Sequence, residues 1–128
     1  MSYRWPLLSA LVLVALSMGV APVRADGDPE AGATVFKKCA ACHNADEKKN
    51  KVGPYLVGIF GRPAGSVEGF KYSKAMSESG IVWSEETISE YVKQPKMFLK
   101  GNRMAFAGLK KDEDVANLIA YLKQATAE

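Results

Sequence analysis

Apolar side chains recur at the spacing of a helix face in three stretches of the chain. Asp28 and Pro29 supply a capping side chain and a proline at the first helical position, so residues 29–41 are predicted to form the first helix. Ser84 caps the second helix, which stops before a proline, and Asp112 opens the third. The apolar positions of the three helices are Gly32, Val35, Phe36 and Cys39, then Ile88, Tyr91 and Val92, and finally Val115, Leu118, Ile119 and Leu122, with Tyr121 beside them.

Short helical turns and long loops connect these helices. Residues 73–79 are predicted to form a short helix that Gly80 ends, and residues 95–99 one further turn. The glycine-rich apolar stretch 52–61 is too punctuated for a strand or a long helix, and is typical of irregular chain that lies against another group. No stretch predicts a strand convincingly. We therefore expect an all-α domain in which several helices and long loops wrap around a cofactor. The predicted loops are residues 44–51, 62–72 and 100–109.

The first 25 residues have the pattern of a secretory signal peptide. Arg4 gives a positive start, residues 7–21 form an uncharged apolar run of 15 residues, and Val23-Arg24-Ala25 has small residues at the usual cleavage spacing. The alternative is an uncleaved membrane anchor, although a spanning helix needs about 20 apolar residues. We expect a cleaved signal peptide, residues 1–25, followed by one domain, residues 26–128.

The charge of the domain is nearly balanced. The whole chain has 17 basic and 14 acidic residues, a net charge of +3, but removal of residues 1–25 takes away Arg4 and Arg24 and leaves +1. Electrostatic recognition must therefore depend on where the lysines lie on the surface. Nucleic-acid binding has no support, because the charge is close to balanced and no recognised motif is present.

Cys39-Ala40-Ala41-Cys42-His43 is the C-x-x-C-H pattern that attaches a c-type haem. Two thiols on one helical turn can each add to a vinyl group of the same porphyrin, and the adjacent imidazole then reaches the iron. A zinc site would need more ligands than two cysteines and one histidine provide, and a thioredoxin-like pair would need a βαβ pattern that is not visible. Both cysteines are used by the haem, so no disulfide is expected.

The second axial ligand of the iron must be a residue other than histidine, because His43 is the only one. The candidates that remain after signal-peptide removal are Met76, Met97 and Met104. Met104 lies in a loop with a glycine at each end, residues 101–108, and such a loop can direct a thioether across the haem from His43. From spacing alone the alternative stays open that Met104 fills a gap in the core, as most methionines do.

Taken together, these residues resemble those of the class I c-type cytochromes, of the mitochondrial and bacterial c2 kind. The resemblance extends from about Gly27 to Glu128. The motifs that carry it are Cys39-Ala-Ala-Cys-His43, Val52-Gly-Pro-Tyr-Leu56, Gly58-Ile-Phe-Gly-Arg62, Gly80-Ile-Val-Trp83, Met104-Ala-Phe-Ala-Gly108 and Leu118-Ile-Ala-Tyr-Leu122.

The resemblance implies a role for several further residues. Met104 resembles the axial sulfur ligand, so the metal ligands would be His43 and Met104. Pro54 resembles the residue whose carbonyl accepts a hydrogen bond from the proximal imidazole, and Tyr91 the hydroxyl near the axial sulfur. Arg62, Tyr72 and Trp83 resemble donors to a buried haem propionate. The resemblance also implies that Gly32, Phe36 and Tyr121 lie where the first and last helices cross.

Two positions depart from the family pattern. Met76 stands where relatives often have a polar Asn near a buried water, and Tyr55 where an Asn is common after Gly-Pro. An apolar side chain at Met76 should loosen or expel that water. These departures concern redox tuning and not the fold.

The function that the resemblance implies is electron transport by one haem c, covalently bound through Cys39 and Cys42, and not catalysis. A cleaved signal peptide with a c-type haem implies a bacterial periplasmic protein, and we expect it to be a monomer. Its partners would be membrane redox complexes: a cytochrome bc1-type quinol–cytochrome c oxidoreductase as donor, and a terminal oxidase or a photosynthetic reaction centre as acceptor. The encounters would be transient and electrostatic, through a basic rim formed by Lys37, Lys38, Lys51, Lys96, Lys100, Arg103 and Lys110.

Two other functions remain open at this stage. A dedicated subunit of one dehydrogenase or oxidase complex would carry the same motifs. A haem peroxidase or gas-binding protein would need an open sixth site and distal polar groups, and the chain has no second histidine to provide them.

Overall fold

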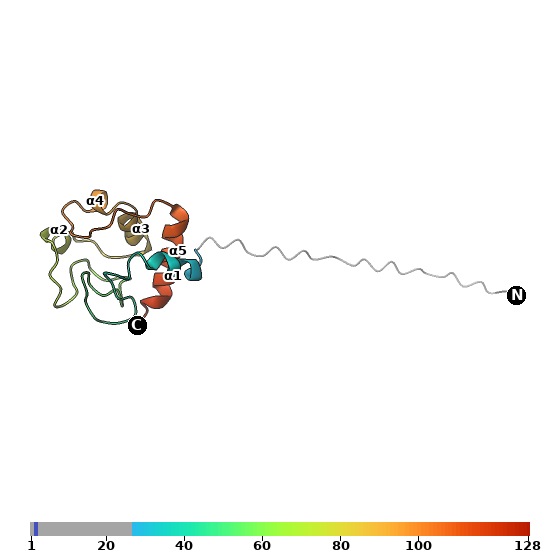
Figure 1. The fold of residues 1–128 in the computed structure, drawn as a ribbon. Coiled ribbons are helices and arrows are strands. Elements are labelled where there is room, and N and C mark those ends of the chain that lie inside the picture. Colours follow the sequence, from blue (N-terminus) through green and yellow to red (C-terminus); the bar gives the residue numbers. More distant parts are fainter. Residues whose placement is uncertain (1, 3–26) are drawn as a thin grey trace.

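The computed structural model describes Ser2 and residues 27–128. Except for Ser2, the predicted signal peptide and its cleavage site after Ala25 lie outside the described residues. Five helices follow one another along the described chain and no strand is present there (Figure 1). A single isolated antiparallel bridge joins Pro63 and Val82. The all-α prediction is confirmed. The helices are α1 (Pro29–Phe36), α2 (Lys74–Ser77), α3 (Glu85–Lys93), α4 (Pro95–Phe98) and α5 (Asp112–Ala125).

Helices α1 and α5 pack against each other (Figure 1), and a glycine lies at their contact. A Cβ atom on Gly32 would overlap the Asn117 carbonyl oxygen and lie 2.7 Å from the Tyr121 Cβ, so only glycine permits this approach. The rings of Phe36 and Tyr121 pack beside the crossing with centroids 5.2 Å apart. The expected contact of Gly32, Phe36 and Tyr121 is therefore confirmed.

Helix α3 begins at a reciprocal cap. The Ser84 side chain accepts a hydrogen bond from Thr87 N, and the Thr87 hydroxyl oxygen accepts one from Ser84 N. Ile88 and Tyr91 are the buried residues of this helix, which packs on α5 and on the short helix α4. Exposed ion pairs join Lys93 to Asp112 and Lys123 to Glu85 across the α3–α5 contact.

The first helix is shorter than predicted. The pattern predicted residues 29–41, but α1 ends at Phe36 and the chain continues in tight turns to Cys42. The hydrogen bonds explain the difference. Lys38 N and Cys39 N each bond to the carbonyl three residues back, which tightens the backbone beyond an α-helix. Of the described helices, none is long and apolar enough to cross a membrane.

Candidate haem site

Cys39, Cys42 and His43 lie on one tight turn. Cys42 N and His43 N both donate to the Cys39 carbonyl, at 3.0 and 2.9 Å. Neither cysteine forms a disulfide, and both are partly buried. Burial, together with the neighbouring Cys42, raises the pKa of the Cys39 thiol. The turn therefore presents two thiols and an imidazole from one short segment, as haem attachment requires.

The imidazole of His43 is held by the carbonyl of Pro54, with Nδ1 and O 2.8 Å apart. A carbonyl oxygen can only accept, so Nδ1 carries the proton and Nε2 keeps its lone pair. Burial lowers the pKa of His43, an effect that the Pro54 hydrogen bond opposes and that the charges of Arg62 and Lys51 increase. The ring is therefore neutral at neutral pH, the form that binds a metal.

Backbone bonds fix the Pro54 segment against the cysteine segment. Gly53 N donates to the Cys42 carbonyl at 2.8 Å, and Leu56 N donates to the Asn44 carbonyl at 2.8 Å. Gly53 also lies directly against the imidazole, because a Cβ there would overlap His43 Cε1 and lie 2.7 Å from Nδ1. The sequence alone did not predict a role for Gly53. Its position beside Pro54 in a glycine-rich stretch was the only indication that its backbone lies close to another group.

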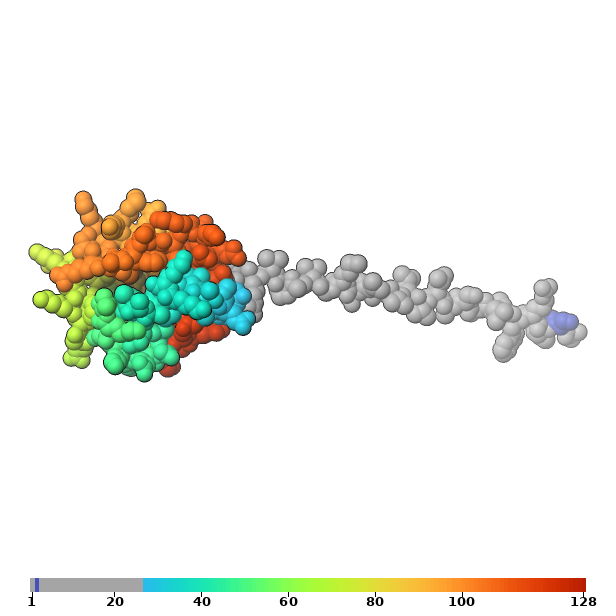
Figure 2. All heavy atoms as spheres, viewed as in Figure 1, coloured from blue at the N-terminus to red at the C-terminus, as the bar shows by residue number. Residues whose placement is uncertain are grey.

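The Met104 loop runs with alternating exposure. Arg103, Ala105 and Ala107 are exposed, while Met104 and Phe106 are partly buried and pack against the hydrophobic core. In Figure 2 this orange segment and the cyan-to-green segment after Cys42 both reach the visible face.

The three candidate methionines differ in burial. Met97 is 80% exposed, so its thioether faces solvent. Met76 is partly buried on α2 and, like Met104, packs against the core. Burial therefore separates Met97 from the other two, and the loop position favours Met104.

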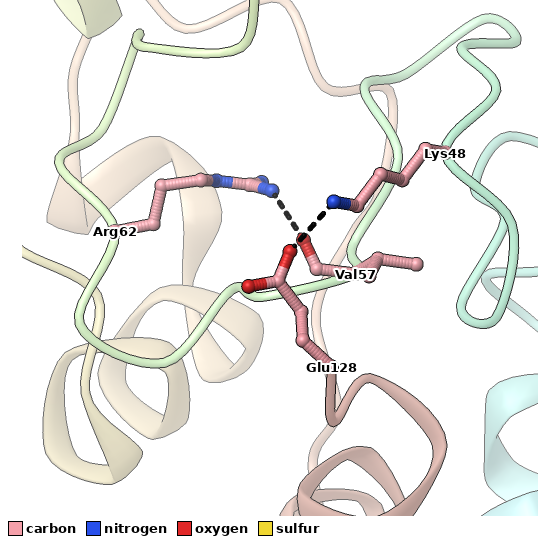
Figure 3. Close-up of polar contacts among 4 residues, drawn as sticks. All are labelled: Lys48, Val57, Arg62 and Glu128. Carbon is pink, nitrogen blue, oxygen red and sulfur yellow. Dashed lines mark hydrogen bonds and ion pairs between the residues drawn. The ribbon is translucent and has the colours of Figure 1, made fainter.

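Arg62 and Tyr72, two of the expected propionate donors, each keep a donor free. Arg62 Nη1 donates to the Val57 carbonyl at 3.2 Å (Figure 3), which uses one of five guanidinium N–H groups. Its guanidinium also lies 5.6 Å from the centre of the Tyr55 ring, and burial lowers its pKa. The Tyr72 hydroxyl accepts from Val67 N at 3.1 Å, so its own proton remains available.

Figure 3 also shows the Lys48–Glu128 ion pair, 2.8 Å long, beside the Val57 carbonyl. The Lys48 hydrogen bond lowers the pKa of the Glu128 carboxyl. Both side chains are largely exposed, so the pair contributes little stability. It does place the end of the chain against the segment that leads to Arg62.

Trp83 and Tyr91 are buried, at 7% and 9% exposure, with ring centroids 5.1 Å apart. Within residues 27–128, neither the Trp83 indole N–H nor the Tyr91 hydroxyl makes a hydrogen bond, yet every fully enclosed side-chain nitrogen or oxygen there has a partner. Neither polar atom is therefore fully enclosed by protein, and each can still donate to a further group. Burial raises the pKa of Tyr91 to about 12.

These observations fit one covalently held haem. Two cysteines outside any disulfide, a neutral imidazole, a partly buried thioether and unused donors meet the requirements of the group and its carboxylates. Residues 27–128 contain no cluster of three or more His, Cys, Asp or Glu side chains that could hold a metal ion by itself. The site thus defines a small helical haem protein.

Comparison with known proteins leads to the same class. A family model described as cytochrome c matches residues 29–126. The chain is 48% identical over 117 residues to cytochrome c2 of Blastochloris viridis, which covers 91% of each chain. It is 53% identical over 103 residues to cytochrome c of Chlamydomonas reinhardtii (79% of this chain, 92% of the relative). It is 52% identical over 99 residues to cytochrome c-550 of Nitrobacter winogradskyi (77% and 91%).

The chain therefore belongs to the cytochrome c family. The expected class I c-type cytochrome fold is confirmed, and the chain is an electron carrier that binds one covalent haem c and not an enzyme. Cys39 and Cys42 are consistent with the attachment of that haem.

Proposed function

We propose that this chain carries single electrons in the bacterial periplasm through a haem whose iron is bound by His43 and Met104. The observation that carries the proposal is the 2.8 Å bond from His43 Nδ1 to the Pro54 carbonyl, which leaves Nε2 as the free ligand atom. The haem, when bound, supplies reversible one-electron chemistry at its iron, and Met/His ligation raises its reduction potential.

The protein's own residues hold this group and tune it. Cys39 and Cys42 attach it, and Pro54 fixes the tautomer and orientation of His43, as outer-shell partners of metal ligands do. Arg62, Tyr72 and Trp83 would offer their unused donors to a buried propionate, and by the resemblance the Tyr91 hydroxyl would lie near the sulfur of Met104. Two protein ligands that keep the iron geometry fixed would leave little rearrangement between the two oxidation states.

The periplasmic location rests on the N-terminal segment. Residues 1–25 have the pattern of a cleaved signal peptide. The match to cytochrome c2 of Blastochloris viridis covers 91% of the chain, so it extends into the residues before Gly27. An intact mass of the native protein tests cleavage after Ala25.

The partners that we propose are membrane redox complexes: a quinol–cytochrome c oxidoreductase as donor, and a terminal oxidase or photosynthetic reaction centre as acceptor. The seven basic side chains of the predicted rim are all exposed. Lys51 Nζ reaches the Ala40 carbonyl at 2.8 Å, which places this charge over the cysteine segment. A basic surface around both ligand segments would steer acidic partners to the haem edge.

Replacement of each methionine tests the ligand assignment. Met104→Leu should abolish the sulfur-to-iron absorption of the ferric protein and lower its reduction potential, because the thioether is lost. Met76→Leu and Met97→Leu are the matched controls and should keep the absorption. Retention of the absorption in Met104→Leu, or its loss in either control, would contradict the assignment.

A further inference from the structure

Asn102 connects the Met104 backbone to helix α4 with three side-chain hydrogen bonds. Its Oδ1 accepts from Met104 N at 2.9 Å. Its Nδ2 donates to the carbonyls of Pro95 and Leu99, at 2.8 Å each. One partly buried amide thus uses its acceptor on the loop and its donors on the helix.

Helix α4, to which Asn102 is bonded, is itself packed into the core. Pro95, its first residue, is fully buried, and the Phe98 ring packs against Tyr91 of α3 with centroids 5.8 Å apart. The two carbonyls that Asn102 bonds lie at the two ends of this short helix. Asn102 therefore anchors Met104 to the core through a rigid element.

The other end of the loop is held much further from Met104. Leu109 N donates to the Val92 carbonyl at 2.8 Å, and Gly108 lies so close to Lys93 that a Cβ would overlap its carbonyl. Leu109 is five positions along the chain from Met104, but Asn102 is only two positions away. The Asn102 contacts therefore fix the backbone from which the Met104 side chain extends.

We propose that Asn102 is the positioning residue of the sixth iron ligand: its two donors on α4 and its one acceptor on Met104 N hold the thioether at the iron and set how readily another ligand replaces it. This inference rests on the proposed ligand role of Met104. No other described side chain bonds the Met104 backbone.

Competition by added imidazole measures this effect in the ferric holoprotein. Asn102→Ala removes all three bonds, and we expect imidazole to bind about tenfold more tightly than to the wild type. Asn102→Asp keeps the acceptor but turns a carboxylate oxygen toward two carbonyls, so it should behave like Asn102→Ala. Asn102→Ser can accept from Met104 N and should restore part of the wild-type resistance.

Thr87→Ala is the control, because it removes a helix cap of α3 that has no contact with the loop. It should lower stability without changing imidazole affinity. A second readout needs no variant: the Met104 amide of the wild type should exchange its hydrogen slowly, because it donates to Asn102.

The outcomes separate the inference from the proposed function. If the wild type lacks the sulfur-to-iron absorption, the ligand role of Met104 fails and the inference fails with it. If the wild type has this absorption but Asn102→Ala and Asn102→Asp bind imidazole no more tightly, only the inference is overturned. Exchange of the Met104 amide at the rate of a free loop overturns it as well.

Discussion

Gly53 shows how one backbone position controls the chemistry of a side chain on another segment. Its missing Cβ lets the imidazole of His43 lie close against the backbone, next to the carbonyl of Pro54 that fixes the ring. The proposed ligand residues were identifiable from the sequence because thiol, imidazole and thioether are chemical types that a sequence displays. Gly53 and Asn102 were not, because their roles depend on backbone atoms that only the folded chain brings to them.

Gly53→Ala should push the His43 ring from its place. Gly53 has no positive φ, so the added methyl group acts only by crowding, which costs about 1–3 kcal/mol in a packed site. We expect lower stability in denaturant and a changed reduction potential. Gly69→Ala is the contrast: Gly69 has φ of 76° with nothing near its Cβ position, so only stability should fall. An unchanged potential in Gly53→Ala would contradict the contact.

Tyr91 should make stability depend on pH in the alkaline range. Its folded-state pKa of about 12 lies above the ordinary value near 10, so the folded protein holds the phenol proton more tightly than the unfolded chain. The stability that results is present below about pH 10 and is lost as the pH rises to about 12.

The measurement compares wild type and Tyr91→Phe, both reduced, by denaturant unfolding across this range. The reduced protein is used because reduced iron is the softer ion and therefore keeps a thioether ligand better than oxidised iron does. The wild type should lose stability relative to the variant only above about pH 10. Parallel stabilities throughout would mean that the hydroxyl is not buried in the folded protein.

Helices were predicted best where local signals and packing agree. The caps at Asp28 and Ser84 and the apolar face of α5 gave correct starts. The prediction that residues 29–41 are helical was wrong after Phe36, because the cysteine segment adopts tighter turns whose hydrogen bonds no spacing rule reports. Asn117 was also missed: this buried amide accepts from Asp28 N at 2.8 Å and ties the start of α1 to α5.

Gly32→Ala should destabilise the crossing of α1 and α5. The new Cβ would overlap the Asn117 carbonyl, which is backbone and cannot rotate away, so we expect a loss of about 2–3 kcal/mol despite the better helix propensity of alanine. Thr34→Ala, on the exposed side of the same helix, should change stability by less than about 0.5 kcal/mol. Equal effects in denaturant unfolding would refute the close approach.

At the scale of the whole molecule, the net charge says little about recognition and the distribution of charge says more. Residues 26–128 by themselves have a net charge of +1, yet exposed basic side chains flank both the cysteine segment and the Met104 loop. The identity of the partners was not predictable, because this sequence contains only one of the two surfaces that meet in each complex.

Lys96→Gln should slow association with an acidic redox partner roughly two- to fivefold at low ionic strength, and added salt should remove the difference. Lys123→Gln removes the same charge from α5, outside the proposed rim, and should change the rate little. Stopped-flow mixing across a series of salt concentrations gives both rates. Turnover that is independent of ionic strength would eliminate the basic rim as a steering surface.

The most direct test of the account is the optical spectrum of the reduced protein before and after addition of carbon monoxide at neutral pH. An iron bound by both His43 and Met104 has no open position, so the spectrum should not change. A clear shift would show an open or weak sixth site. Met104 would then lose its proposed role, and a gas-binding or peroxidatic function would replace electron transport as the better explanation.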